Sequence, residues 1–334
     1  MPLPIYFAPL QGYTEDAFRR AHHELCGGVD CYYTPFLRLE QGEIRKKDNL
    51  SIRPEFNIGV PLAIQVIARD GDELKVLLDG IRQHAHSWTD RRAKVQEDVA
   101  AESLGPSWPD AERILVDINM GCPFPMQVSH GRGAGVLAHA DKVKEICDVM
   151  RLHPDFDYSV KMRLGVEGNE DCRTILPLLN DAPLKHITLH PRVARQMYDG
   201  SVDMPFFQQF ASSCAHPLVY NGDVTSVEDI NRIEQALPQL KAVMIGRGLL
   251  ARPTLAREYK TGISASTSEV VSAFKLLHEA LYRHYSSTIP GEQQLLNKMR
   301  TLWEYAEPTI GRKPWKKIHK AGNLRNYLRA IDEL

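Results

Sequence analysis

Eight short apolar runs, separated by amphipathic segments, constrain the fold of this chain more than any other feature. Each run is long enough for one buried strand, and the runs cover residues 5–10, 31–37, 61–67, 114–119, 158–164, 186–191, 217–221 and 242–246. Segments with helical periodicity lie between them, for example at 15–26, 72–86, 140–152 and 226–236. Eight strands alternating with helices over about 250 residues favour a (β/α)8 TIM barrel. A doubly wound sheet is the alternative, but it usually has fewer strands, and no GxGxxG motif follows the first run.

Two stretches exceed what such a barrel needs. Residues 87–112 are charged, contain prolines and predict a surface excursion between the third and fourth runs. A cluster of glycine, serine and threonine at 261–268 is followed by helical periodicity at 270–285 and 292–305. We therefore expect a catalytic barrel domain over residues 1–260 and a small all-helical domain over residues 261–334.

The composition is that of a globular chain with a sizeable core, since 43% of the 334 residues are hydrophobic and 25% are charged. The first residues lack the basic and apolar regions of a signal peptide, and no stretch approaches the about 20 apolar residues of a membrane span. The six cysteines form no CxxC pair, so neither a disulfide framework nor a zinc site is indicated. We expect a cytoplasmic protein without bound metal. We also expect a monomer, because no heptad repeat or long apolar surface run is present.

The segment 114–137 carries the most reactive candidate side chain. Its apolar run breaks into Gly121, Cys122 and Pro123, and a glycine-rich run, GRGAG, precedes the next helix. One thiol therefore lies at the carboxyl end of a strand, where such barrels place their chemistry. A buried structural cysteine is the simpler interpretation of a lone thiol. The other strand ends are what favour a functional role.

Those ends contribute cations, amides and an imidazole to the same mouth of the barrel. The residues are Gln11, Gln65, Asn119, Lys161, Arg163 and His190. Each has a structural explanation by itself, such as a salt bridge for Lys161, but together they predict a functional site. Lys161 alone would suit either a Schiff base or the stabilisation of an electron-rich ring. A Schiff-base aldolase, however, has no need for a glycine-flanked thiol.

The last two runs end in glycine-containing loops, NGD at 221–223 and GRG at 246–248, and we expect a short helix over 249–259. Backbone N–H groups and a helix N-terminus at this place form the usual phosphate site of such barrels. Arg247 would add a cation. The pattern therefore predicts a phosphorylated ligand without identifying it.

The stretch 297–334 is basic, with nine lysines and arginines against four acidic residues. Such a cluster is compatible with a solvated helical face and equally with a surface that faces phosphates.

Six segments, in this order, resemble the tRNA-dihydrouridine synthases. They are APLQGYTEDAFR, NMGCPFPMQVSHGRGAGVL, VKMRLG, LHPRVARQMYDG, VYNGDV and VMIGRG, and they span nearly the whole chain. The resemblance implies a flavin-binding barrel followed by a helical domain that helps to hold tRNA. It further implies bound FMN as cofactor, with NADPH or NADH as a transient reductant.

The resemblance also implies a role for individual residues. Cys122 would protonate C5 of a flipped-out uridine whose C6 receives a hydride from reduced FMN, because a thiol with a pKa near about 8.5 holds its proton at neutral pH and can still release it. The residues implied at the flavin are Pro9, Leu10, Gln11, Gln65, Lys161, His190, Asn221, Gly222, Asp223, Gly246 and Arg247. Those implied at the uracil or elsewhere on the tRNA are Arg38, Asn119, Arg163, Tyr198, Lys298 and Arg300.

Four of these residues resemble the pattern of the bacterial branch that acts on uridine 16, namely Arg38, Tyr198, Lys298 and Arg300. The chain departs from the family pattern at Pro35, where an acid is expected, and at Pro191, which removes a backbone donor beside His190. Two other functions stay open. One is an FMN-dependent barrel oxidoreductase of a free pyrimidine, similar to dihydroorotate dehydrogenase, and the other is a tRNA-binding relative without catalytic activity.

Overall fold

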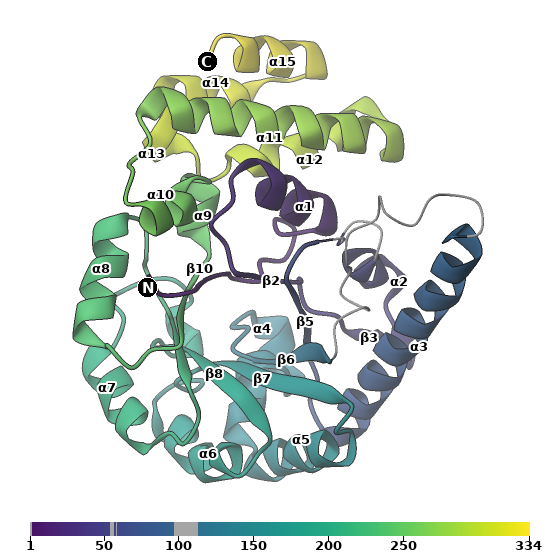
Figure 1. The fold of residues 1–334 in the computed structure, drawn as a ribbon, viewed down its shortest axis with the longest axis vertical. Helices are drawn as coiled ribbons and strands as arrows, with labels where there is room; N and C mark the ends of the chain where they lie inside the picture. The colour runs from purple at the N-terminus through teal and green to yellow at the C-terminus, as the bar shows by residue number, and fades with distance from the viewer. Residues whose placement is uncertain (1, 54–56, 58, 97–112) are drawn as a thin grey trace.

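A closed barrel of eight parallel strands forms the centre of the molecule (Figure 1). The computed structural model describes residues 2–53, 57, 59–96 and 113–334, with 86–96 as backbone. The strand order around the barrel is β1-β10-β9-β8-β7-β6-β5-β2. The strands are β1 (Ile5–Phe7), β2 (Cys31–Tyr33), β5 (Leu62–Val66), β6 (Ile114–Met120), β7 (Phe156–Arg163), β8 (Leu184–His190), β9 (Leu218–Asn221) and β10 (Ala242–Ile245). The predicted (β/α)8 fold is confirmed.

Each apolar run corresponds to one strand, with small differences at the ends. The first two strands are shorter than predicted, because Pro9 and Pro35 lack the N–H group that would continue the ladder. The strands β7 and β8 begin earlier than predicted, at Phe156 and Leu184. Alternating apolar side chains fill the barrel and the layer between strands and helices, as the fully buried Ile64, Val116 and Val160 illustrate.

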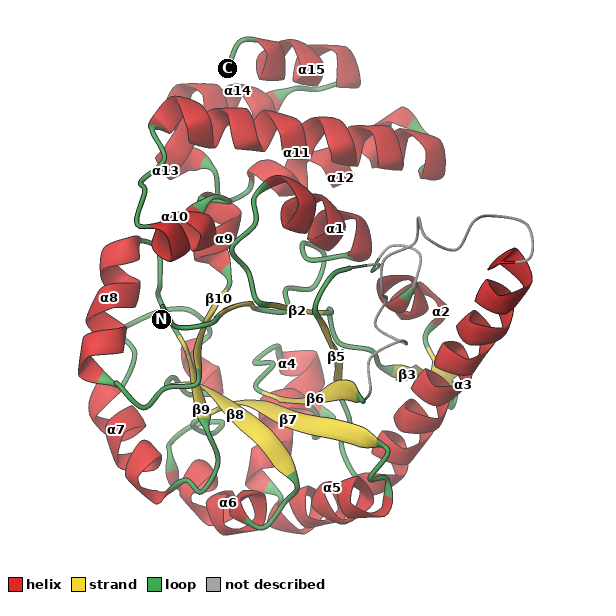
Figure 2. Ribbon diagram, in the orientation of Figure 1, coloured by secondary structure: helices red, strands yellow, loops and turns green. Residues whose placement is uncertain are grey.

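Helices cover the outside of the barrel (Figure 2). They are α1 (Asp16–Leu25), α3 (Gly71–Gln96), α5 (Ala140–Leu152), α6 (Glu170–Asn180), α7 (Met204–Ser213) and α8 (Val227–Ala236). The helix α5 has the predicted bounds. The helix α8 begins after Ser226, whose side chain forms a reciprocal capping box with Asp229.

Two local predictions are wrong. The helix expected over 72–86 continues to Gln96, since neither proline nor glycine interrupts residues 81–96, and the surface excursion over 87–112 stays a prediction. Residues 97–112 lie outside the described part of the chain. The single helix expected over 249–259 is instead two short helices, α9 (Arg247–Ala251) and α10 (Leu255–Thr261). Arg252 between them is extended (φ −141°, ψ 85°), as the residue before Pro253 favours.

Short elements that the sequence did not indicate lie in three connections of the described chain. Between β2 and β5 the chain forms the antiparallel pair β3 (Leu39–Glu40) and β4 (Glu43–Ile44), followed by α2 (Lys46–Asn49) and the 3₁₀ turn η1 (Leu50–Ile52). Between β6 and α5 lie α4 (Pro125–Ser129) and the 3₁₀ turn η5 (Gly133–Ala138). A third 3₁₀ turn, η6 (Ala194–Gln196), follows β8.

The chain after α10 is helical and packs beside the barrel against its outer helices, with α11 against α1 (Figure 1). It contains α11 (Thr267–Thr288), α12 (Glu292–Arg300), η7 (Thr301–Trp303), α13 (Glu307–Ile310), α14 (Arg312–Lys320) and α15 (Leu324–Asp332). The helix α11 begins after Ser266, which forms a capping box with Glu269. The buried ring of Trp303 stacks on Phe274 and donates its indole N–H to the Tyr327 hydroxyl at 2.9 Å, which ties α11 and α15 together.

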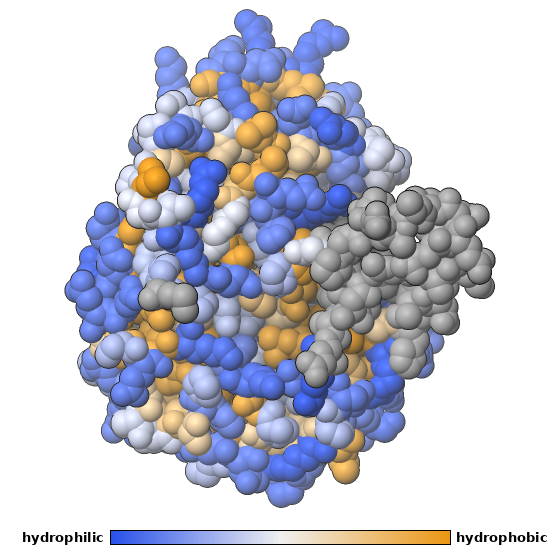
Figure 3. Space-filling model, viewed as in Figure 1, coloured by the Kyte–Doolittle hydropathy of each residue, from blue (hydrophilic) through white to orange (hydrophobic). Residues whose placement is uncertain are grey.

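Hydrophilic side chains cover much of the face seen in Figure 3 and project from the end formed by the C-terminal helices. Within the described residues, no helix is both long enough and apolar enough to span a bilayer. All six cysteines are free thiols.

Candidate functional site

A cavity of about 740 Å³ opens at the carboxyl ends of the strands. Most of the residues singled out from the sequence line it. These are Pro9, Leu10, Gln11, Asn119, Cys122, Lys161, Arg163, His190, Tyr198, Asn221, Gly222, Asp223, Gly246 and Arg247. The C-terminal helices complete the wall with Glu304, Tyr305, Glu307 and Pro308. The cavity therefore lies between the barrel mouth and the helical region.

Four of the predicted site residues do not line this cavity. Gln65 is fully buried beneath it. The guanidinium of Arg38 lies 3.4 Å from the buried carboxylate of Asp48. That ion pair directs Arg38 toward α2, and Arg38 does not line the cavity.

Lys298 and Arg300, predicted as tRNA contacts, are used inside the protein. The Lys298 ammonium lies 2.8 Å from the Glu15 carboxylate, donates to the Gly12 carbonyl at 3.1 Å and faces the Tyr285 ring. Arg300 donates to the Ala321 carbonyl. Both cations hold the C-terminal helices in place, because their partners belong to the fold.

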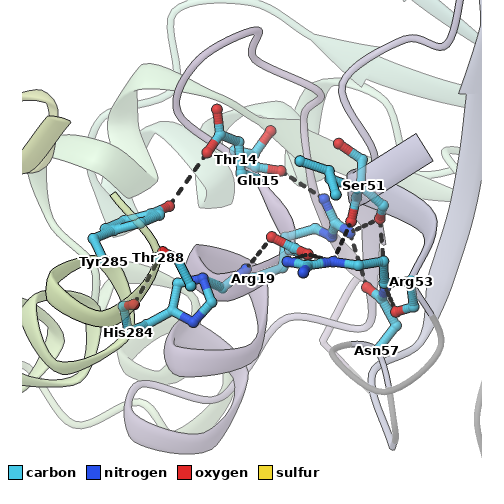
Figure 4. A network of polar contacts seen from close by, with 12 residues as sticks. Thr14, Glu15, Arg19, Ser51, Arg53, Asn57, His284, Tyr285 and Thr288 are labelled. Carbon is cyan, nitrogen blue, oxygen red and sulfur yellow. Dashed lines mark hydrogen bonds and ion pairs between the residues drawn. The ribbon is translucent and has the colours of Figure 1, made fainter. Parts of the chain in front are cut away.

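The loop after β1, which carries Pro9, Leu10 and Gln11, is supported by a buried cation (Figure 4). Arg19 of α1 is fully buried and donates to the Thr14 carbonyl at 2.7 Å and to the Ser51 carbonyl at 2.6 Å. The backbone N–H of Leu10 donates to the Thr14 hydroxyl at 2.9 Å. These bonds fix the part of the cavity wall that carries Pro9, Leu10 and Gln11.

Cys122 is held in a tight turn after β6. The side-chain oxygen of Asn119 accepts from the backbone N–H groups of Gly121 (3.0 Å) and Cys122 (2.8 Å). The glycine-rich run packs directly on the thiol residue, since a Cβ at Gly133 would lie 2.7 Å from the Cys122 Cβ and its φ is +57°. Burial raises the pKa of the thiol, while a backbone hydrogen bond at Phe124 and the charges of Arg163 and Lys161 oppose that rise. The thiol is therefore protonated at neutral pH.

Two cations of β7, Lys161 and Arg163, lie beside the thiol, and His190 of β8 lies next to them. Asn119 pairs with Lys161 across β6 and β7, and Arg163 pairs with His190 across β7 and β8. Burial, followed by the charge of Arg163, lowers the pKa of Lys161 to about 8, so this lysine is mostly charged at pH 7. Burial and the surrounding cations hold the pKa of His190 well below its ordinary value, so its imidazole is neutral. The site thus combines a protonated thiol, a charged lysine and a neutral histidine.

Two arginines of the cavity wall concentrate positive charge around Asp223. This residue adopts a left-handed conformation (φ 42°), and its carboxylate accepts from Arg192 at 2.9 Å and from Arg247 at 3.3 Å. The Nε atom of Arg192 is buried and has no hydrogen-bond partner within the described chain. The guanidinium groups of Arg247 and Arg163 lie 4.6 and 5.4 Å from the centre of the Tyr198 ring. Two arginines at one part of the cavity wall suit an anionic ligand group.

Several residues of the site were missed by the sequence reasoning. Asp117 is fully buried in β6, two positions before Asn119, and a charged residue on the same face of an apolar strand could have signalled it. Arg192 follows His190 in the HPR segment. Phe124 lines the cavity with 52% of its surface exposed. For Glu304 and Tyr305 no local signal exists, because only the packing of the helical region brings them to the barrel mouth.

Fold and site together define a (β/α)8-barrel protein with a thiol and an anion-suited cavity at the carboxyl ends of its strands. Residues 110–331 match the family described as dihydrouridine synthase. The chain belongs to this family.

Two curated relatives and one solved structure illustrate the likeness. The chain is 29% identical over 202 residues to the Xenopus tropicalis protein named tRNA-dihydrouridine(47) synthase NAD(P)(+)-like. The aligned region covers 56% of this chain and 31% of that protein. It is 26% identical over 264 residues to the tRNA-dihydrouridine(16) synthase of Neisseria meningitidis serogroup A, covering 77% and 71%. The chain thus spans about a third of the first relative's length. The old yellow enzyme homologue of Zymomonas mobilis shares the fold, with a TM-score of 0.51 at 12% identity over 80% of this chain and 92% of that one.

Proposed function

We propose that this protein is a tRNA-dihydrouridine synthase, which reduces the C5=C6 bond of a uridine in tRNA with bound FMN and NADPH or NADH as the transient reductant. One observation carries the proposal: in a chain of this family, Cys122, Lys161 and the arginine pair on Asp223 surround one cavity. The reaction needs an acid above the base, a polarised site for an electron-rich ring and a place for a phosphate, and each has a candidate here.

The residues present fit FMN. The cavity volume of about 740 Å³ lies within the range of about 300–1,000 Å³ of small-molecule sites. The guanidinium groups of Arg192 and Arg247 flank Asp223 at the cavity wall and supply positive charge for a phosphate there. The residues that would hold the phosphate end are Asn221, Gly222, Asp223, Gly246 and Arg247, and those along the ring are Pro9, Leu10, Gln11, Lys161 and His190. When bound, FMN supplies the hydride that the uridine receives at C6.

The side chains around the thiol supply the remaining chemistry. Cys122 keeps its proton at neutral pH because it is buried, and the turn held by Asn119 fixes its direction, so it donates that proton to C5. Lys161 holds a positive charge beside the cavity and favours negative charge on the group bound there. Arg163 and Tyr198 line the part of the wall nearest the thiol and are the candidates for contact with the uracil.

We propose that the tRNA-binding surface is on α14 rather than at Lys298 and Arg300. The exposed cations Arg312, Lys313, Lys316 and Lys320 of this helix have no ion pair with any side chain that the structure describes. Unpaired surface cations neutralise phosphates and make binding salt-dependent. The target uridine must leave the tRNA stack to reach the cavity. We also propose that the protein is cytoplasmic and monomeric.

Uridine 16 is the proposed position, and its support is the likeness to the Neisseria meningitidis protein of that name. Three of the four residues that suggested it from the sequence, Arg38, Lys298 and Arg300, have internal partners. Tyr198 lines the cavity.

A map of dihydrouridine in tRNA from cells with and without the gene tests the proposal. Loss of dihydrouridine at one position supports the reaction and identifies the site. An unchanged map, together with reduction of a free pyrimidine by the purified protein, would favour the dihydroorotate-dehydrogenase-like alternative. Protein that takes up no FMN would favour the inactive tRNA-binding relative.

A further inference from the structure

A chain of three buried polar side chains runs beneath the cavity to the turn of Cys122. Gln65 of β5 donates from Nε2 to the Asp117 carboxylate at 2.7 Å, and Asn119 of β6 donates from Nδ2 to Gln65 Oε1 at 2.8 Å. The side-chain oxygen of Asn119 then accepts from the backbone N–H groups of Gly121 and Cys122. Asp117 and Gln65 are fully buried. We refer to Asp117, Gln65 and Asn119 as the buried amide chain.

The direction of every hydrogen bond in this chain is determined by its two ends. At one end, an ionised carboxylate only accepts, so the atom of Gln65 that faces Asp117 must be the nitrogen. At the other end, backbone N–H groups only donate, so the atom of Asn119 that faces the Cys122 turn must be the oxygen. The two requirements agree at the central bond from Asn119 to Gln65. Reversal of either amide would oppose two donors or two acceptors.

This direction decides what Asn119 offers to the cavity. Its oxygen accepts two backbone bonds and one of its N–H groups is bonded to Gln65, so the second N–H is the group that has no partner within the described chain. Asn119 lines the cavity. It therefore presents a hydrogen-bond donor there, which suits a carbonyl oxygen such as those of uracil and not the amino group that cytosine carries.

We propose that Asp117 is a positioning residue of this site, which orients Gln65 and Asn119 so that the Cys122 turn is held and an N–H donor faces the cavity. The benefit for uracil rests on the proposed function. The support of the Cys122 turn does not depend on it, because it follows from hydrogen bonds within the protein. Ser159 also donates to Asp117, at 2.6 Å, but lies outside the path to Cys122.

Variants at these positions separate positioning from simple support of the fold. Asp117→Leu removes the acceptor and leaves the Gln65 amide without its partner, whereas Asp117→Asn keeps an acceptor oxygen of similar shape. Ser159→Ala is the matched control, because it removes a buried bond to the same carboxylate without interrupting the chain to Asn119. Gln65→Met interrupts the buried amide chain at its centre with a side chain of similar volume. This variant replaces Asp117→Leu in the test if Asp117→Leu does not fold.

The readout is the alkylation rate of Cys122 by iodoacetamide in the full-length protein as purified, measured by peptide mass spectrometry with Cys214 as the internal reference. In the parent the turn limits access, since Cys122 is 8% exposed. We expect Asp117→Leu and Gln65→Met to raise the rate about tenfold, because the turn opens more often once Asn119 is no longer held. Asp117→Asn and Ser159→Ala stay within about twofold of the parent. A folded Asp117→Leu or Gln65→Met protein with the parental rate would overturn the proposal, as would an equal rise in Ser159→Ala.

A second measurement separates this inference from the proposed function. In the reduction of tRNA uridine, we expect Asp117→Leu to lower kcat while the KM for tRNA changes little, because the proposed tRNA-binding surface is on α14. If the parent protein does not reduce tRNA but the alkylation rates follow the expected order, the proposed function fails and the positioning role stands. If the parent reduces tRNA but the alkylation rates do not change, only the positioning role fails.

Discussion

Replacing Lys298 with methionine tests whether the C-terminal helices are held by this lysine or use it to bind RNA. Its side chain is only 16% exposed, and its ammonium is paired with Glu15 and bonded to the Gly12 carbonyl. Methionine keeps much of the apolar stem and removes the charge. The change therefore addresses the polar contacts and leaves most of the packing intact.

The expected loss follows from these contacts. A hydrogen bond to a charged group contributes about 1.5–3 kcal/mol, and the contact of Lys298 with the Tyr285 ring, at 5.1 Å from its centre, adds about 0.5–1 kcal/mol. Solvent reaches Glu15, which is 28% exposed, and reduces the first figure. We expect the free energy of unfolding to fall by about 2 kcal/mol. For a chain of 334 residues that corresponds to a melting temperature lower by about 3 °C.

Thermal unfolding and tRNA binding at several salt concentrations provide the test, with Lys313→Met as the matched control. Lys313 is an exposed cation of α14, so its loss should leave the melting temperature within about 1 °C and reduce the salt dependence of tRNA binding by about one phosphate contact. Lys298→Met should show the opposite pattern. A Lys298→Met protein of unchanged stability and weakened tRNA binding would refute the structural role.

Three further predictions address the cavity. Cys122→Ala should slow dihydrouridine formation by about 10²–10⁴-fold and leave FMN bound, as measured by turnover and flavin absorbance; unchanged turnover would exclude the thiol as the acid. Because the pKa of Lys161 is about 8, its charge is lost as pH rises from 7 to 9. The FMN affinity, measured by fluorescence titration, should therefore fall over this range in the parent and stay constant in Lys161→Met. An equal pH dependence of FMN affinity in the two proteins would contradict the place of Lys161 at the ring. Gly133→Ala, at φ +57° and against the Cys122 Cβ, should cost about 1–3 kcal/mol in a thermal melt, and a parental melting temperature would show that the turn adapts.

The barrel could be predicted from the sequence because its signals are local. Each apolar run is buried on both faces, so it contrasts with the amphipathic helices on either side. Helix starts such as Ser226 also follow from residues within one turn of each other. The break at Pro253 is local too, but the helix expected over 249–259 ignored it.

Most of the cavity could be predicted for a topological reason. In a closed parallel barrel all strands point the same way, so residues at the carboxyl ends must meet at one mouth however far apart they lie in the chain. Cys122, Lys161, His190 and Asp223 come together for that reason. Gln65 was expected at the same mouth, but its amide bonds to Asp117 and Asn119 and lies below the cavity.

The sequence by itself thus determined the barrel, the mouth that carries the thiol and the end that carries the phosphate-suited loops, since these depend on strand order and strand ends. Only the tertiary structure decided which cations are free. Lys298 and Lys313 both lie in the same basic stretch, yet one meets Glu15 of the first barrel connection and the other meets solvent. Periodicity marks the apolar face of a helix, but the partner of a charged side chain is set by the element packed against it, which no local pattern specifies.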